Sequence, residues 1–560
     1  MKSFSRLAVF FTIAAFLFSS CTHKNEAGKM IPKDAMFVLH IDTKSLGQKL
    51  PWSEVQSSAW WSKIKTHLAE VHHLTDSAVN QLLDHPENSG IDLDKGLIYF
   101  VTKNPGGDAQ LVSEGSIKDA DAFGKFYKQL DTAATIQKDG QFNIVTIKDK
   151  MAVVWNSSNF AAAVALPSTP MNMNSLGDTT TVAPLIDKSV GLASLCKNLF
   201  SLKSDSSLAE DAKFTKLLKE PGEIHAWVNS EAIMKSSTGL GMLGMLKLDD
   251  IIKGSVSTYT VNFDNGKIDI SHKGYSGKEL EDLLKKYNGS GIDIDMLKSI
   301  PSQDVIGYLG LNFKPEGLKE FIKLLGLDGM ANTGLQRAGI TLDDIVKAMK
   351  GDVMLAFTDL SVNKDTLMPM SKPDFNVLFS FSIGDKQSLQ KVVDAGKNLT
   401  SAMHAADDTS IAYGQNDHVF AITNHQHFLN DYLAGKANSK FDFTDKLSGH
   451  SVAFYLDIHK ILTAASASQK YDNREDSSVM AASLNLWNNV ISTGGSFDGD
   501  AMTGHTEINF IDQNTNSLKQ LNNYLNAIVP VIAEKEKKWK ASSADSTLLP
   551  APPPAVDSAK

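Results

Sequence analysis

The stretch IPKDAMFVLHIDTKSL at residues 31–46 returns in altered form as IPSQDVIGYLGLNFKPEGL at residues 300–318. Both copies begin with Ile-Pro, continue through an Asp into an apolar strand, and reach Asp42 or Asn312 before a helix start. Two similar strand–helix openings in one chain indicate an internal duplication, which predicts a fold built from two similar units.

Five further matches follow in the same order along the two halves of the chain. Each match joins strands, hairpins and helix starts of the same type. The matched segments are 91–101 with 340–357, 109–130 with 375–396, 142–164 with 409–433, 223–234 with 450–462, and 257–275 with 493–511. The order predicts a first α+β repeat over residues 31–285 and a second over residues 286–512. The segments 142–164 and 409–433 are each expected to form a hairpin that leads into a helix.

The strands of both repeats alternate apolar and polar side chains. Tyr259, Val261 and Phe263 share one side, and the turn Asp264-Asn265-Gly266 follows them. Because Asn-Gly accepts the positive φ angles of a tight primed turn, a hairpin is expected here, with Phe263 equivalent to Phe497. The predicted fold class is α+β: a duplicated unit of antiparallel or mixed β-sheet, with helices packed on one face because the alternation leaves the other face polar.

The first residues, MKSFSRLAVFFTIAAFLFSSC, have the order of a secretory signal peptide. A short basic region precedes an uncharged run that is too short to span a bilayer, and small residues precede Cys21. This arrangement resembles a bacterial lipobox. It predicts a signal peptide over residues 1–20, lipidation of Cys21 and a lipidated tether over residues 21–30; a plain signal peptide with an incidental Cys is the alternative.

The residues after Cys21 bear on the destination of the chain. Position 23 is His23, so the Asp that retains lipoproteins at the inner membrane is absent, and no dense acidic run follows. We therefore expect an outer membrane lipoprotein of the cell envelope, held by its lipid anchor, with the periplasmic side favoured over the cell surface.

The composition excludes several classes of protein. The 560 residues carry a net charge of -9 and include 42% hydrophobic and 21% charged residues, which is ordinary for a globular chain. Among 55 basic residues only three are arginines, so nucleic-acid binding is not expected. With Cys21 lipidated, Cys196 has no partner for a disulfide and is expected to be a buried small hydrophobe.

The chain beyond the second repeat has a different character. A helical pattern over residues 513–540 predicts a C-terminal helix with a kink at Pro530. Residues 541–560 are rich in Pro and Ala without a periodic apolar face, which predicts a disordered tail. The Pro/Thr/Asn-rich loop at 167–184 has no counterpart in the second repeat.

Four strand ends carry an Asp or Asn directly before a helix. The residues are Asp42, Asn229, Asn312 and Asp457. We expect each to cap the following helix, since such side chains accept hydrogen bonds from the free N–H groups of the first turn. The alternative, four oxygen ligands gathered around a cation, is less favoured because a cap belongs at this corner.

No catalytic signature stands out. Gly239, Gly241 and Gly244 satisfy GxGxxG, but a helix precedes them where a nucleotide site needs a strand, so a packed helix or an apolar flap is expected. Three Ser-x-x-Lys matches lack the companion motifs of β-lactamases. The paired histidines at 72–73 and 425–427 are expected at the solvated surface. No catalytic, cofactor-binding or metal-binding residue is predicted, and no cofactor.

Trp52, Trp60 and Trp61 cluster within LPWSEVQSSAWWSKI. Because neighbouring residues of a helix point in different directions, at least one of Trp60 and Trp61 is expected to be partly exposed. Exposed aromatic side chains would permit a glycan platform.

Three Asp-Ser/Thr triplets lie in segments expected to be accessible. Some bacteria O-glycosylate exported proteins at such triplets, and a glycan needs exposed chain. Thr179, in the loop at 167–184, and Ser546 and Ser558, in the tail, are the predicted acceptors.

The lipobox, the opening IPKDAMFVLHIDTKSL and the duplicated body together resemble the Bacteroidota lipoproteins with domain of unknown function 4836. The resemblance implies an extracytoplasmic, lipid-anchored protein without known functional residues. We expect a non-catalytic binding or scaffolding role toward envelope proteins or glycans, of unknown ligand and oligomeric state. An extracytoplasmic hydrolase with an unrecognised site and a carrier of apolar ligands remain as alternatives.

Overall fold

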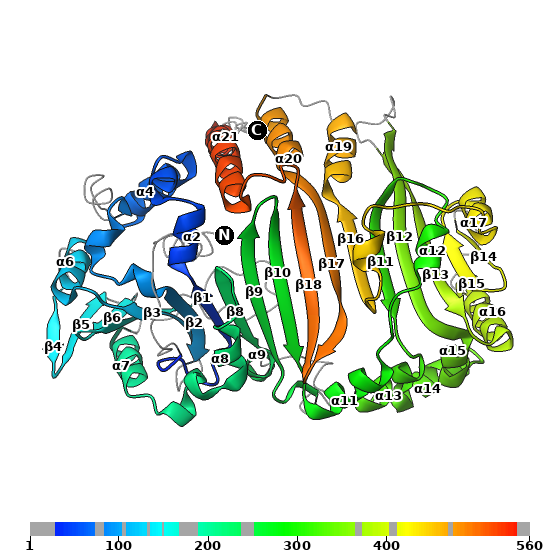
Figure 1. Ribbon diagram of the computed structural model, residues 1–560, viewed down its shortest axis with the longest axis horizontal. Helices are drawn as coiled ribbons and strands as arrows, with labels where there is room; N and C mark the ends of the chain where they lie inside the picture. Colours follow the sequence, from blue (N-terminus) through cyan, green and yellow to red (C-terminus); the bar gives the residue numbers. More distant parts are fainter. Residues whose placement is uncertain are drawn as a thin grey trace, which may run out of the picture.

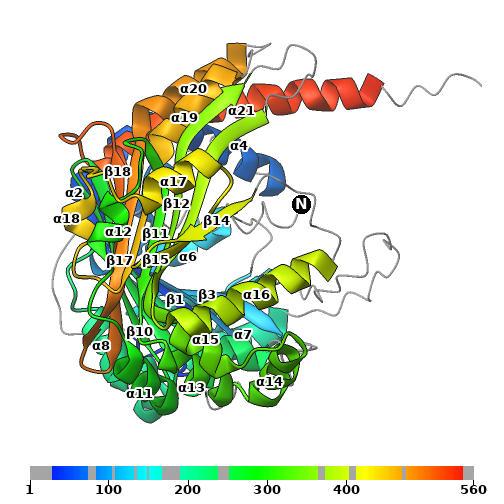
Figure 2. The same ribbon diagram turned by 90° about the vertical axis from the view of Figure 1, so that its right-hand side faces the viewer.

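A computed structural model of the chain describes residues 28–72, 83–103, 108–130, 135–147, 151–166, 189–236, 251–363, 372–402, 411–468 and 474–545. One long twisted β-sheet runs through the whole molecule, with helices above and below it in Figure 1. Seen from the side, the sheet is curved, and α21 and α16 project from the same side of it (Figure 2).

The sheet contains 18 strands. The strands of the first half are β1 (Phe37–Ile41), β2 (Leu97–Lys103), β3 (Ala109–Ser116), β4 (Gln137–Asp139), β5 (Phe142–Ile147), β6 (Met151–Trp155), β7 (Asn159–Ala165), β8 (Ile224–Asn229), β9 (Val256–Asp264) and β10 (Lys267–Tyr275). Those of the second half are β11 (Val305–Asn312), β12 (Met349–Asn363), β13 (Lys372–Ile383), β14 (Ala412–Gln415), β15 (Val419–Thr423), β16 (Val452–Asp457), β17 (Trp487–Asp498) and β18 (Ala501–Phe510).

The helices, in chain order, are α2 (Thr43–Lys49), α3 (Trp52–Gln56), α4 (Ala59–His72), α6 (Ala120–Leu130), α7 (Ser189–Phe200), α8 (Ala212–Leu217), α9 (Ser230–Ser236), α11 (Lys278–Tyr287), α12 (Ile294–Lys298), α13 (Glu316–Leu324), α14 (Asp328–Arg337), α15 (Leu342–Ala348), α16 (Lys386–Ala402), α17 (Gln426–Leu433), α18 (Thr444–Leu447), α19 (Ile458–Ser468), α20 (Arg474–Leu486) and α21 (Ser517–Asp545). No helix in the described ranges is long and apolar enough to cross a membrane.

The strand pairing repeats between the halves. In space the first half runs β4-β5-β6-β7-β3-β2-β1-β8-β9-β10. The second half continues as β18-β17-β16-β11-β12-β13-β15-β14. Apart from the outer side of β14, each strand from β11 to β18 thus has the neighbours of its first-half counterpart, and every pairing is antiparallel. The duplication is partial, because β4 and β5 have no counterpart among the described residues of the second half.

The two halves join through β10 and β18, which are themselves counterparts. Ser271 lies seven residues after Asp264 and His505 lies seven residues after Asp498, the equivalent turn residue. The pairing places Ser271 directly opposite His505. When equivalent strands pair antiparallel in this way, a pseudo-two-fold axis passes between them, perpendicular to the sheet. Figure 1 agrees, since α9 and α11 lie below the sheet where their counterparts α19 and α21 lie above it.

The prediction that helices cover one face only is wrong. Alternate residues of β6 enter two different cores, Ala152 and Val154 on one face and Val153 and Trp155 on the other. Helices α7 and α8 contribute to the first of these cores, while α4, α6 and α21 contribute to the second. The second half likewise has one core with α12, α17 and α18 and another with α16. The sequence pattern missed this because a strand buried on both faces loses its alternation.

The sheet has two faces, which we call the first face and the second face. The first face carries the core that includes Ala501, and the second face carries the core that includes Phe263. Glu507 lies six residues after Ala501 along β18, so it shares the first face. It pairs with Ile491, which belongs to the core around α17. The first face therefore runs continuously from one half to the other.

The segment after the turn at residue 157 is a strand and not the expected helix. Its run Asn159–Ala165 forms β7 between β3 and β6. Alanine favours helices in isolation, but Ala161 and Ala163 are fully buried between neighbouring strands here. Tertiary packing therefore overrides local propensity.

The predicted hairpin of β9 and β10 is present, but its turn is not a primed one. Among residues 264–266 only Gly266 has a positive φ, of 71°, whereas the type I′ turn needs two. The turn is instead fixed from outside, because the Gly266 N–H donates to Thr515 O at 2.9 Å and Gly266 O accepts from the Phe510 N–H at 2.8 Å.

Three of the four predicted helix caps are confirmed. Asp42 accepts from the Ser45 N–H, Asn229 from the Ala232 N–H and Asp457 from the Lys460 N–H, at 2.8 to 3.0 Å. The prediction for Asn312 is wrong. Its side chain accepts from the Ser290 N–H and donates to Asp352, because α13 begins only at Glu316.

The C-terminal helix is longer than predicted. Helix α21 spans Ser517–Asp545, so it includes Pro530 and continues into residues 541–545, which the sequence assigned to the disordered tail. Its first half packs through Leu518, Leu521 and Leu525 onto the second face of the first repeat.

Candidate functional site

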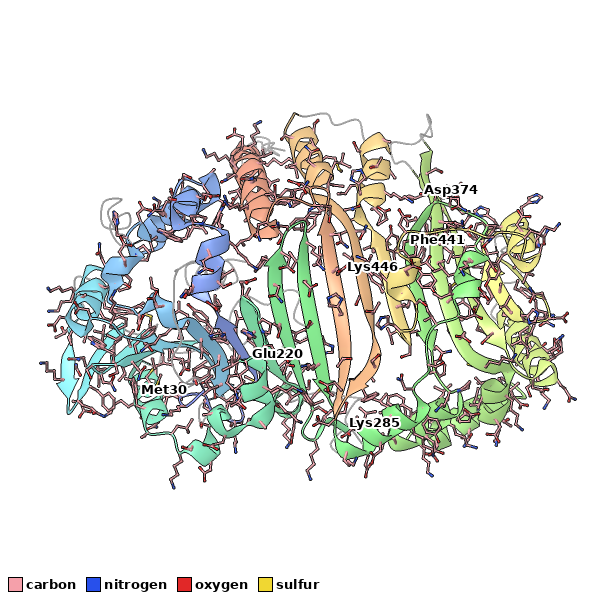
Figure 3. The ribbon with its side chains drawn as sticks, viewed as in Figure 1. Met30, Glu220, Lys285, Asp374, Phe441 and Lys446 are labelled. Atoms are coloured by element: carbon pink, nitrogen blue, oxygen red, sulfur yellow. The ribbon has the colours of Figure 1, made fainter. Side chains whose placement is uncertain are left out.

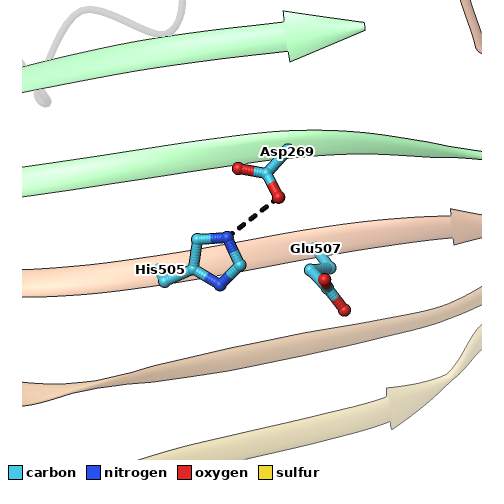
Figure 4. A group of neighbouring side chains, drawn as sticks. All are labelled: Asp269, His505 and Glu507. Atoms are coloured by element: carbon cyan, nitrogen blue, oxygen red, sulfur yellow. Dashed lines mark hydrogen bonds and ion pairs between the residues drawn. The ribbon is translucent and has the colours of Figure 1, made fainter. Parts of the chain in front are cut away.

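A group of ionisable side chains lies on the first face where the two halves meet. We call it the charged seam: Lys267 and Asp269 on β10, His505 and Glu507 on β18, and Lys446 on α18. His505 Nε2 lies 2.9 Å from Asp269 Oδ2 (Figure 4). Lys267 Nζ donates to Asp269 at 3.0 Å and to Glu507 at 2.5 Å, and Lys446 donates to the other oxygen of Glu507.

The β-strand period explains the gathering of these groups. Residues 267, 269 and 271 alternate with the apolar Ile268 and Ile270, so the polar side chains share the first face. The antiparallel register then sets Asp269 opposite Glu507 and Ser271 opposite His505. The seam thus follows from pairing residues more than 230 positions apart.

A second ion pair mirrors the seam across the pseudo-axis with its charges exchanged. Lys273 is the counterpart of Glu507, since each lies nine residues after its turn residue Asp264 or Asp498. Lys273 pairs with Glu220, after α8, and Glu507 pairs with Lys446, on α18. Glu220 and Lys446 are on opposite sides of the central strands in Figure 3. The duplicated positions therefore keep an ion pair while reversing its polarity.

The seam does not suit a metal ion. Ligand atoms of Asp269, His505 and Glu507 lie within 4.8 Å of one another, which is close enough for a shared cation. However, the ammonium groups of Lys267 and Lys446 already occupy the carboxylate oxygens. A divalent cation would have to displace two positive charges, so the arrangement favours an ion-pair network.

The electrostatics of the seam favour the charged forms of Glu507 and Lys267. Burial opposes ionisation of Glu507, but hydrogen bonds from Lys267 and Lys446 outweigh it and hold the pKa of Glu507 below its ordinary value. Burial likewise opposes the charge on Lys267, while Glu507 and Asp269 raise the pKa of this lysine. These shifts stabilise charges and do not bring either group toward neutral pH.

Together with the neighbouring Ser271, the seam presents the three residue types of a serine hydrolase. His505 contacts Asp269, and Ser271 lies opposite His505 in the strand register. In such a triad the carboxylate interacts with the imidazole and orients it, without a second charged partner. Here Asp269 also pairs with Lys267. The seam lies on a sheet face, and the His505 side chain is 44% exposed. The geometry is that of a surface network.

A hollow lies apart from the seam, between α13 and α15. Its volume is about 270 Å³, and it is lined mainly by charged and polar side chains: Lys319, Glu320, Lys323, Asp328, Asn332 and Asp343. Such a lining does not suit an apolar ligand.

Several residues singled out from the sequence are placed by the structure. Cys196 is fully buried, and burial raises the pKa of its thiol to about 12, as expected for a small hydrophobe. His425 and His427 are exposed. Lys65 and Lys197 pair with Asp84 and Asp139, so neither belongs to a Ser-Lys dyad.

The prediction of an exposed tryptophan at residues 60–61 is wrong. Trp60 is 4% exposed and Trp61 is 1% exposed. Helix α4 packs against both the core of the second face and α21, so both directions are covered: Trp60 Nε1 donates to Asn522 on α21, and Trp61 meets Trp52 edge-on. Trp60 and Trp61 are therefore not available for a glycan platform.

Other predicted sites lie outside the described residues: the lipidated Cys21, the acceptors Thr179, Ser546 and Ser558, and the glycines Gly239, Gly241 and Gly244. The sequence pattern alone does not reveal the seam. The one sequence signal for the seam is the row of polar side chains on β10, on the face opposite Ile268 and Ile270. Only the pairing of β10 with β18 brings His505 and Glu507 next to these side chains.

The fold and the seam define a duplicated α/β protein built on one antiparallel sheet, whose central ionisable groups neutralise one another. The chain belongs to the family described as Domain of unknown function (DUF4836), whose model matches residues 28–518. No curated protein matches this chain. Among solved structures, crystal form III of TP0453 is similar at 8% identity with a TM-score of 0.24, over 47% of this chain and 86% of that chain.

Proposed function

We propose that this protein is a lipid-anchored envelope protein with a non-catalytic binding or scaffolding role. Cys21 would carry the lipid after removal of residues 1–20, and the outer membrane, on its periplasmic side, is the proposed location. The proposal extends to a bacterial lipoprotein of the Bacteroidota type, as the lipobox suggests.

The charged seam carries the non-catalytic part of the proposal. A general acid or base works best with a pKa near the operating pH. Glu507 and Lys267 are shifted in the opposite sense, each toward its charged form. This pattern is that of an ion-pair network that fastens two halves of a sheet.

The position of the first folded residues supports a role close to the membrane. Ile31 is fully buried, and its carbonyl accepts from the Leu208 N–H at 2.9 Å. Cys21 is seven residues before Gly28, where the described chain begins. Seven extended residues reach at most about 25 Å. A lipid on Cys21 would therefore hold the folded body within that distance of the bilayer.

The binding part of the proposal is supported by the second face. Leu309 and Leu311 on β11 and Phe454 on β16 lie on this face and are only partly buried. Partly exposed apolar side chains on a sheet are suited to contact another molecule.

The anchor is tested by Cys21→Ala. One or more acyl chains on Cys21 hold the protein to membranes, so the variant is expected to move from the membrane pellet to the soluble fraction. Radiolabelled palmitate should enter the parent protein and the control Cys196→Ala, but not Cys21→Ala. Persistent pelleting of Cys21→Ala, or absence of label from the parent, would contradict the anchor.

The hydrolase alternative rests on Asp269, His505 and Ser271, and a capture experiment separates it from binding. Lipidated protein and the variant Ser271→Ala are cross-linked in envelope membranes, and their partners are identified by mass spectrometry. A binding role predicts the same partners for both proteins. Turnover of model esters by the parent that Ser271→Ala abolishes would establish the hydrolase instead.

A further inference from the structure

The two repeats end their sheets differently at β6 and β14. These strands are counterparts, and the same turn follows each. Asn156 N–H donates to Asn159 O at 3.1 Å, and Asn416 N–H donates to Val419 O at 3.0 Å. The side chains of Asn156 and Asn416 each accept two further backbone N–H groups of the turn.

In the first repeat another strand covers the outer side of β6. Strand β5 pairs with it from Asn143 opposite Trp155 to Ile147 opposite Met151. Among the described residues of the second repeat, no strand pairs with the outer side of β14, whose one strand partner there is β15. The first repeat thus displays what fits against this edge.

The turn fixes which backbone groups of β14 face outward. Because the Asn416 N–H points toward β15, the antiparallel alternation also turns the N–H and C=O of Gly414 and Ala412 toward β15. The same groups of Tyr413 and Gln415 then point to the open edge. By register these two residues correspond to Val153 and Trp155, which bind β5 in the first repeat.

The side chains at this edge do not protect it. Proteins commonly guard free edges with charged residues. The opposite edge of the sheet follows that practice, since the short β4 carries Lys138 and Asp139. Strand β14 has no charged residue, Tyr413 is 47% exposed, and the preceding Ile411 is 61% exposed.

We propose that the edge of β14 binds an extended segment of a partner protein by strand addition, in the place that β5 holds in the first repeat. The segment would carry apolar side chains at alternate positions, on the side of Tyr413 and Ile411, and would pair with the outward groups of Tyr413 and Gln415. The inference rests on the proposed binding role and names its partner chemistry. Its failure would leave anchoring through Cys21 unaffected.

A peptide copied from β5 provides the probe. The labelled peptide GQFNIVTIKD, residues 140–149, is titrated into the full chain and followed by fluorescence anisotropy. We expect saturable binding, with slower hydrogen exchange at residues 411–415 in the complex. Gln415→Pro removes one outward N–H without touching the bonds to β15, and it should weaken binding at least tenfold.

The matched control is Gln415→Ala, which keeps the backbone donor and should bind as the parent does. Thermal unfolding of both variants near the parent temperature verifies that β14 still folds. Absence of saturable binding would overturn the proposal, as would equal affinity of Gln415→Pro and Gln415→Ala. Sedimentation of the free chain as a dimer that Gln415→Pro dissociates would assign the edge to a second copy and likewise overturn it.

Discussion

Glu114 on β3 and Ser380 on β13 occupy the same place in the two repeats but have different surroundings. Ser380 pairs in register with Met354, and Glu114 with Ile98. The Ser380 hydroxyl accepts from Tyr432 and donates to Phe420 O, whereas Glu114 Oε2 has no partner in the described structure. Burial raises the pKa of Glu114 to about 8.

Glu114→Gln is therefore expected to stabilise the protein as the pH rises. The folded-state pKa lies above the unfolded value of 4.5, so the folded form binds the extra proton. The contribution of Glu114 is fully present below pH 4.5 and is lost toward pH 8, at about 1.4 kcal/mol per pH unit. Between pH 5 and 8, the free energy of unfolding of the variant should rise relative to that of the parent, as measured by chemical unfolding. For the exposed control Glu210→Gln the difference from the parent should not change with pH. A constant difference for Glu114→Gln would refute the assignment.

His40 and His225 face each other across β1 and β8. Their Nδ1 atoms lie 3.1 Å apart, and His225 Nε2 donates to Glu220 O. The neutral His225 ring then accepts at Nδ1, so His40 supplies the proton. Burial, and then the neighbouring His225, lower the pKa of His40 to about 3, and burial also lowers the pKa of His225.

Acid should weaken the protein through this pair. Both folded-state pKa values lie below the unfolded value of 6.5, so the unfolded chain binds more protons. The stability is present above pH 6.5 and is lost as the pH falls toward 3, at about 1.4 kcal/mol per pH unit for each ring that titrates. In a Glu114→Gln background, which removes the opposing slope, His40→Ala with His225→Ala should flatten the dependence between pH 5 and 6.5. Gly310 and Ala453 already stand at these positions in the second repeat. An unchanged slope would contradict this account, and His427→Ala serves as the exposed control.

At the scale of elements, the joint between β10 and β18 depends on more than backbone pairing. Lys267 and Glu507 form a partly buried ion pair across it, with side chains 29% and 12% exposed. Lys216 and Asp498 also form an ion pair between the halves, but they are 57% and 60% exposed. Solvent weakens the second pair much more than the first.

A double-mutant cycle compares the two pairs. Lys267→Met with Glu507→Gln is expected to give a coupling of about 1 kcal/mol, against less than about 0.5 kcal/mol for Lys216→Met with Asp498→Asn. Because the folded-state pKa of Glu507 is lowered, the first coupling should be present above its unfolded value of 4.5 and fade as the pH falls below it. Equal couplings for the two pairs would show that the seam does not fasten the sheet.

In the molecule as a whole, the pseudo-two-fold axis relates the two repeats, and the ends of the described chain lie outside them. One continuous sheet joins both repeats, and the ends of the described chain, at Gly28 and Asp545, lie outside the repeated strands. The predicted glycosylation acceptors therefore lie in segments outside the described strands of the sheet. In the sequence, Thr179 falls between β7 and α7, and Ser546 directly follows α21; both residues are outside the described part of the chain.

We predict that Thr179, Ser546 and Ser558 are glycosylated. Protein isolated from its native host should exceed the mass of the lipidated polypeptide by whole glycan units, because these acceptors need accessible chain. Thr179→Ala, Ser546→Ala and Ser558→Ala should each remove one unit, and Thr132→Ala, at a triplet next to α6, should remove none. An intact mass equal to the lipidated polypeptide would refute it.

Local sequence patterns predicted many of the elements and the order in which they repeat. Alternating apolar residues indicated the hairpin of β9 and β10, the Asx residues at three strand ends predicted their caps, and the repeated Ile-Pro openings predicted a shared strand order. These features are encoded locally, since a cap or a strand period depends on residues within a few positions. The family resemblance drew on the same local motifs.

How the two repeats meet depends on tertiary contacts, which the sequence pattern does not show. Pairing of β10 with β18 joined them into one sheet, brought Asp269 to His505, and left β14 as an edge. Packing on both faces turned the Ala-rich β7 into a strand and buried both Trp60 and Trp61. Each of these outcomes depends on contacts between segments far apart in the chain, whose free energy exceeds the small local preferences that a sequence pattern reports.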